Sequence, residues 1–131
     1  MAYELPVSQQ AVSLTAAADL SALQYTFVKL DSAGKVVAVA AATDIPVGVL
    51  QNAPTSGKTA EVVVHGVTKL KASAAITTPK LVGTTSTGTA VGLAAGTDTT
   101  KYILGQAITP AGASGDVITV AISCNAPARA V

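Results

Sequence analysis

The chain has 131 residues, of which 50% are apolar, only 3% are aromatic and 11% are charged, and its net charge is +1. A typical globular domain is about 25% charged, so we expect partner proteins to cover part of this surface. The balanced charge argues against nucleic acid or an anionic membrane as a partner, and the few aromatic residues argue against a stacking platform for sugars or single strands.

The chain length suits one domain or two small lobes. The opening "MAYELPVSQQ" lacks the basic and apolar parts of a secretory signal. No stretch approaches the roughly 20 apolar residues of a membrane span, so we expect synthesis in a cytoplasm. A single cysteine, Cys124, excludes an intrachain disulfide, and we expect it to be a small buried apolar residue.

Residues 1–13 predict an extended N-terminal arm. Pro6 removes a backbone donor and favours an extended chain. Tyr3, Leu5 and Val7 alternate, as a strand would present them to one face. We expect this arm to have no partner strand in its own chain and to order on a neighbouring protein.

Residues 14–131 predict an all-β domain. Short β-branched runs recur every 8 to 12 residues between Gly, Pro, Asn, Asp and Ser, which is typical of a sandwich or barrel. The segment "ADLSAL", residues 18–23, predicts one helical turn with Asp19 as a possible cap. The predicted strands cover residues 12–16, 25–30, 35–40, 47–52, 60–65, 67–72, 80–84, 89–93, 102–108 and 116–123.

An internal repeat organises these strands. The stretch "FVKLDSAGKVVAVAAATD", residues 27–44, aligns without a gap with "LVGTTSTGTAVGLAAGTD", residues 81–98. With small shifts, Gly48 then aligns with Gly105, and Gly57 with Gly115. The repeat, covering about 27–66 and 81–124, predicts two similar strand-hairpin units that form small sandwich or barrel-like lobes.

The segment "NAPTSGKT", residues 52–59, is close to a phosphate-binding loop. Gly57, Lys58 and Thr59 fill the second half of that pattern, but Asn52 replaces its first glycine. A phosphate-binding loop must also open a helix, whereas "TAEVVVHGV" follows here. We therefore interpret the segment as a turn between strands.

Few residues are candidates for chemistry. His65, the only histidine, lies on the strand face opposite Val62 and Val64, and we expect it to be structural or solvated. We expect Asp44 and Asp98 to hydrogen-bond turn backbone rather than bind calcium.

Lys69 and Lys71 share one face of the strand "VTKLKA". They indicate either a solvated edge strand guarded by lysines or a contact with an acidic partner. We predict no catalytic residue, metal ligand or cofactor site.

The residues "ADLSALQYTFVKLDSAGKVV" and "IPVGVLQNAPTSGKTAEVVVHGVTKLKA" resemble the capsid decoration, or cement, proteins of tailed bacteriophages and prophages. The similarity covers about residues 14–122 and is strongest from Asp19 to Lys71. It implies an all-β homotrimer that binds the outer face of an assembled capsid, bridges neighbouring major capsid subunits and carries no catalytic residue. The candidate contacts to the capsid or to other subunits are Tyr3, Leu5, Pro6, Val7, Lys69 and Lys71.

Two other classes of function remain open. The first is a binding module, such as a virion fibre base or an adhesin that recognises a host-surface glycan. The second is a hydrolase that uses His65, for which no Gly-x-Ser-x-Gly nucleophile motif is present. We expect the structural function, because it needs repeated modest contacts rather than chemistry.

Overall fold

The computed structural model describes residues 9–131, and over this range the protein is all-β, without a helix. Tyr3, Leu5, Pro6 and Val7 lie outside the described residues. None of the described residues forms a helix of the length and hydropathy needed to cross a membrane.

The strands are β1 (Gln9–Thr15), β2 (Phe27–Leu30), β3 (Val36–Ala38), β4 (Gly48–Leu50), β5 (Thr59–Lys71), β6 (Lys80–Thr84), β7 (Ala90–Gly92), β8 (Gly105–Ala107) and β9 (Val117–Ser123). The predicted all-β fold is therefore confirmed.

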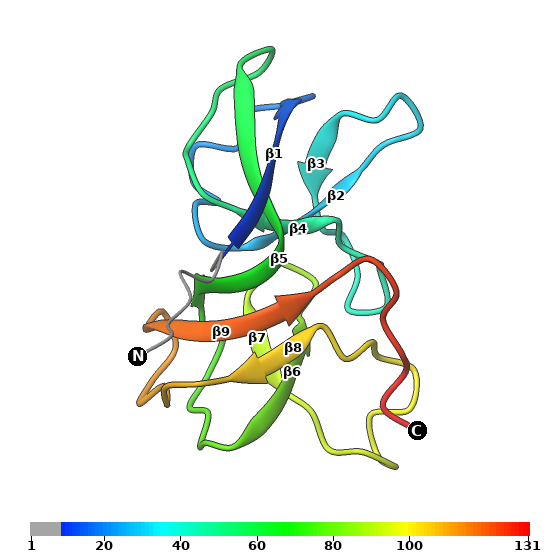
Figure 1. The fold of residues 1–131 in the computed structure, drawn as a ribbon, viewed down its shortest axis with the longest axis vertical. Coiled ribbons are helices and arrows are strands. Elements are labelled where there is room, and N and C mark those ends of the chain that lie inside the picture. The colour runs from blue at the N-terminus through cyan, green and yellow to red at the C-terminus, as the bar shows by residue number, and fades with distance from the viewer. Residues whose placement is uncertain (1–8) are drawn as a thin grey trace, which may run out of the picture.

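The strands form two barrel-like lobes joined by the long strand β5 (Figure 1). The hydrogen-bonded order is β3-β2-β4-β5-β9-β8-β6-β7, with β1 added to β5. The first lobe contains β1 to β4 and the first half of β5, and the second lobe contains the second half of β5 and β6 to β9. A parallel bridge between Ala16 and Val36 brings the two ends of the first lobe together, and one between Ala72 and Ala90 does the same in the second.

The strand registers repeat between the lobes. In the first lobe Val28 pairs with Ala38, and in the second Val82 pairs with Gly92. The next pairs follow the same rule: β2 pairs with β4 as β6 pairs with β8, and β4 pairs with β5 as β8 pairs with β9. The second half of β5 pairs with β9 as β1 pairs with the first half of β5, so it is the counterpart of β1.

Two glycines show how closely the registers correspond. A Cβ atom added to Gly48 would lie 2.2 Å from the Val63 carbonyl oxygen, and one added to Gly105 would lie 2.2 Å from the Ala121 carbonyl oxygen. The neighbouring backbone leaves no room for a side chain at either position, so both must be glycine. The repeat alignment in the sequence pairs the same two glycines.

Each lobe has its own apolar interior. The first contains Ala16, Leu20, Val28, Val36, Leu50, Ala60 and Val62. Their counterparts in the second are Ala72, Ile76, Val82, Ala90, Ala107, Ile118 and Val120. The second cluster also holds Phe27, Val49 and Val63, which belong to strands of the first lobe and point out of its interior. These three side chains fasten the two lobes together.

Three expectations from the sequence are wrong in part. Residues 9–13 do not belong to an arm without a partner strand, because they form most of β1, which pairs with β5 over its whole length. The strands predicted at 60–65 and 67–72 are one strand, since Gly66 continues the ladder with a φ of +119°. Residues 18–23 form turns rather than a helical turn, and the Asp19 carboxylate accepts a hydrogen bond from the Ser21 amide.

Candidate functional site: an open groove on the second lobe

Four residues from four strands form a row on the outer face of the second lobe. Val67 of β5 lies opposite Ala121 of β9, Ala121 lies opposite Gln106 of β8, and Gln106 lies opposite Leu81 of β6. All four side chains are exposed, Val67 to 37% and Leu81 to 36%. We call Val67, Ala121, Gln106 and Leu81 the open row.

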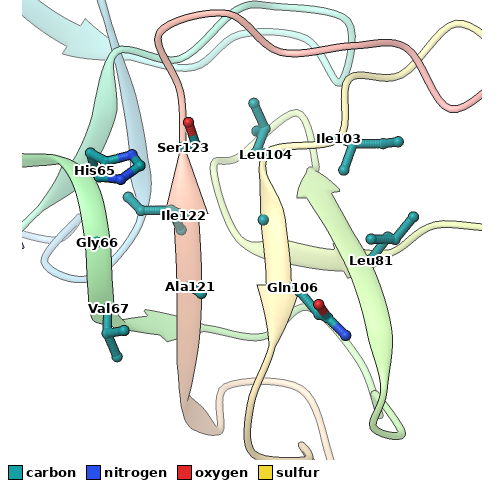
Figure 2. A pocket seen from close by; sticks show the side chains of 11 residues that line it. His65, Gly66, Val67, Leu81, Ile103, Leu104, Gln106, Ala121, Ile122 and Ser123 are labelled. Atoms are coloured by element: carbon teal, nitrogen blue, oxygen red, sulfur yellow. The ribbon is translucent and has the colours of Figure 1, made fainter. Parts of the chain in front are cut away.

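The open row lines a groove of about 430 Å³ (Figure 2). Gly66, Gly105 and Ala121 carry little or no side chain, which hollows the surface across β5, β9 and β8. Val67 borders the groove on one side, and Leu81 and Ile103 border it on the other. The lining is mostly apolar and contains no Asp, Glu, Lys or Arg residue. Such a surface suits packing against another protein rather than chemistry.

A second hollow of about 380 Å³ lies beside the groove. Gln10, Val64, His65, Ser123 and Asn125 line it. His65 and Ser123 border both hollows, so they separate the apolar groove from a more polar one.

His65 is exposed, as predicted. It lies opposite Ser123 on β9 and opposite Gln10 on β1. Among the described residues, no group of three or more His, Cys, Asp or Glu side chains could hold a metal ion.

Lys69 and Lys71 point to the same side of β5 as Val67, beyond the groove. The Lys69 ammonium lies 5.7 Å from the centre of the Tyr25 ring, within the range of a cation–π contact. Lys71 is partly buried, and its amide donates to the Tyr25 carbonyl. The half of β5 that carries these lysines has ladder pairs with β9 alone, because β1 and β4 pair with residues 59–66, so the expectation of an edge strand fits this half. A contact of these lysines with an acidic partner stays a prediction.

Tyr25 connects the two lobes through its backbone. It adopts a φ of +62°, a conformation that residues other than glycine rarely take. Its amide donates to Leu50 of the first lobe, at 2.7 Å, and its carbonyl accepts from Lys71 of the second, at 2.8 Å. These two bonds hold the tyrosine in that conformation.

Asp44 and Asp98 bind turn backbone, as predicted. The Asp44 carboxylate accepts from the Lys29 ammonium at 2.8 Å and from the amides of Ala40 and Ala41. The Lys29 bond, aided by these amides, lowers the Asp44 pKa. The Asp98 pKa is lowered first by the Ala94 amide and then by Lys101, whose ammonium lies 3.2 Å away. Both carboxylates are therefore structural.

The segment at 52–59 is a turn that leads into β5. Gly57 has a φ of +80°, and its amide donates to the Ala16 carbonyl. The Asn52 side chain bridges the start of β5 by donating to the Thr59 carbonyl and accepting from the Glu61 amide. The predicted strand after the turn is confirmed, so no helix N-terminus faces this loop.

Cys124 is buried, as predicted. Burial raises the pKa of its thiol from 9.0 to about 12. The thiolate is the reactive form, so this cysteine is inert in the folded protein.

Comparison with known proteins finds a similar fold among solved structures. No protein-family model matches the chain, and no curated protein matches it. Among solved structures, the fold is similar to the N base of the head fiber gp8.5 of bacteriophage phi29, with a TM-score of 0.67. The match covers 88% of this chain and 94% of that one, at 20% sequence identity. It therefore establishes a shared fold.

Sequence reasoning missed the open row. Its members are separated along the chain and come together only through the registers of four strands. The one available signal was the repeat alignment, which aligns Leu81 with Phe27. Phe27 is buried, whereas Leu81 is exposed.

Proposed function

We propose that this protein is a structural component of a bacteriophage virion. It binds the outer surface of the assembled capsid, bridges major capsid subunits and acts as a homotrimer. The observation that carries the proposal is the similarity of almost the whole chain to the base of a phage head fibre. Proteins that share a fold often differ in function, so the proposal also draws on the surface itself.

Two features of the surface support a structural function. The groove is open and mostly apolar, which suits protein partners. The titratable groups with lowered or raised pKa values are held in turns or buried, and none of them borders the groove. We propose no catalytic activity, no cofactor, and neither nucleic acid nor membrane as a partner.

A second function, the base of a virion fibre, is favoured by the same structural match. A fibre base would hold a projecting host-binding module rather than bridge capsid subunits. The polar hollow at Gln10, His65, Ser123 and Asn125 offers amide and hydroxyl groups to a host-surface glycan.

Cryo-electron microscopy of the virions that contain this protein separates the two functions. For a decoration protein we expect density on the outer shell, at threefold or quasi-threefold positions between capsid subunits. Density at the foot of a projecting fibre would favour the second function. Absence of the chain from purified virions, measured by mass spectrometry, would overturn both.

A further inference from the structure

Three of the four residues of the open row have counterparts in the first lobe that are completely buried, whereas the counterpart of Val67 is Ala11 of β1, which is exposed. The strand registers assign Phe27 as the counterpart of Leu81, Val49 as that of Gln106 and Val63 as that of Ala121. Phe27, Val49 and Val63 are all 0% exposed. Over these three strands, the same face of the same fold is therefore covered in one lobe and open in the other.

The second lobe supplies the cover, in part through its β6–β7 hairpin. The Phe27 amide donates to the Gly88 carbonyl of this hairpin at 2.8 Å. A Cβ atom added to Gly88 would lie 2.5 Å from the Phe27 carbonyl oxygen and 3.3 Å from the Thr26 Cβ. The hairpin and the covered row are thus in direct contact.

The corresponding hairpin of the first lobe, between β2 and β3, is free. It has the same turn: the Asp31 amide donates to the Lys35 carbonyl and the Gly34 amide to the Asp31 carbonyl, as Thr85, Thr89 and Gly88 do in the second lobe. A Cβ atom added to Gly34, however, would meet no atom within 4 Å. Within residues 9–131, the molecule therefore has a hairpin without a contact at its turn on one lobe and an uncovered row on the other.

We propose that the hairpin at residues 31–35 of one copy docks on the open row of a second copy. This contact repeats between molecules the one that already joins the two lobes. Each surface carries an exposed leucine, Leu30 at 41% on the hairpin side and Leu81 at 36% on the row. Lys80, next to Leu81, also provides a charge opposite to that of Asp31 on the hairpin.

Such a contact is heterologous, because each copy uses a different surface for each neighbour. Heterologous contacts close into rings when the rotation between copies allows it. The contact therefore gives the proposed trimer a specific interface. It does not require capsid binding: a protein that assembles by this contact but fails to bind capsids would overturn only the proposed function.

Two aspartate substitutions at exposed positions test the contact. We expect Leu30→Asp and Leu81→Asp each to weaken self-association by about tenfold or more, measured by light scattering up to about 200 μM. Ile45→Asp is the matched control, since Ile45 is 55% exposed on the loop at the other end of β3. It should assemble like the unchanged protein.

A mixture of the two variants gives the sharpest result. The Leu81→Asp copy retains its hairpin and the Leu30→Asp copy retains its row, so the mixture should form one-to-one dimers that do not extend. Cysteines at Ala33 and Lys80 provide a second measurement. Ala33→Cys and Lys80→Cys chains should cross-link to each other through a short bismaleimide, but not each to itself, and the buried Cys124 should not react.

Three outcomes would overturn the proposal. The first is an unchanged protein that stays monomeric at about 200 μM. The second is assembly that both aspartate variants leave intact. The third is assembly lost only when residues 2–8 are deleted, which would assign the row to the N-terminal segment.

Discussion

Two aspartates at corresponding turns make the stability of the fold depend on pH. The bonds to Asp44 and Asp98 lower both pKa values below 3.8 in the folded protein. In the unfolded chain these groups bind protons nearer the ordinary value, so their contribution is present at neutral pH. It is lost as the pH falls through 3.8 and then through the lower folded pKa values.

We predict that replacing both residues flattens the acid side of the stability profile. Each of Asp44→Asn and Asp98→Asn should lower the stability at pH 7, because the charged acceptor of the turn amides is lost. Urea unfolding at pH 7 and at about pH 3 measures the effect. The double variant should lose less stability than the unchanged protein between these values. Asp19→Asn removes one carboxylate whose pKa is also lowered, by its bonds to Ser21, so it should flatten the profile less than the double variant does. An equal loss of stability in the unchanged protein, the double variant and Asp19→Asn would contradict the prediction.

At the scale of single elements, β1 is part of the first lobe and not a detachable arm. Its residues Gln9–Thr15 pair with β5, and Leu14 packs against the interior of the first lobe. The described contacts of the chain begin at Gln9, whose side-chain amide donates to the Val67 carbonyl.

Two deletions therefore have different expected outcomes. Removing residues 2–8 should leave the melting temperature nearly unchanged, since it touches none of the described contacts. Removing residues 2–15 should destabilise the protein by more than about 3 kcal/mol, because β5 loses its partner on one edge. Thermal unfolding followed by circular dichroism measures both. If the longer deletion melted like the unchanged protein, β1 would be dispensable to the fold.

Strand existence was predictable from the sequence, but strand continuity was not. Alternating β-branched runs and the glycines between them predicted the strands of both lobes, and the aligned glycines predicted the two-unit plan. Gly66 was interpreted as a break, because glycine within a strand pattern usually marks a bend. Residues 9–11 are polar or small, so no alternation marked the start of β1.

The groove was beyond sequence reasoning for a different reason. Whether its residues are exposed depends on which lobe covers the other. The sequence does not show this, because the aligned positions 27 and 81 are both apolar. Packing between the lobes buries Phe27 and leaves Leu81 open. Of the predicted contact residues, Lys69 and Lys71 lie on the same side of β5 as the groove.

At the scale of the whole molecule, the two lobes should unfold together. They share β5, and Phe27, Val49 and Val63 of the first lobe pack in the cluster of the second. Val62 and Val120 occupy corresponding places in the two interiors. A substitution that destabilises either interior should therefore lower the stability of both lobes.

We predict that Val62→Ala and Val120→Ala each cost about 2 kcal/mol and move a single common transition. Amide hydrogen exchange, followed residue by residue, should show β4 and β8 losing protection together in both variants. Val117→Ala, at a position 49% exposed on β9, is the control and should have little effect. Separate transitions for the two lobes would contradict this prediction.

The passage of β5 from one lobe to the other has a geometric consequence. The repeated units meet without a linker, inside a strand, where the register shifts by one residue between Gln10 and Ala11 and leaves Val64 without an opposite residue. Gly66 follows two positions later with a φ that side-chain-bearing residues rarely adopt. A few backbone torsion angles in this part of β5 therefore determine the angle between the two barrels. A substitution there would re-aim one intact barrel relative to the other, and with it the curvature of any assembly built from them.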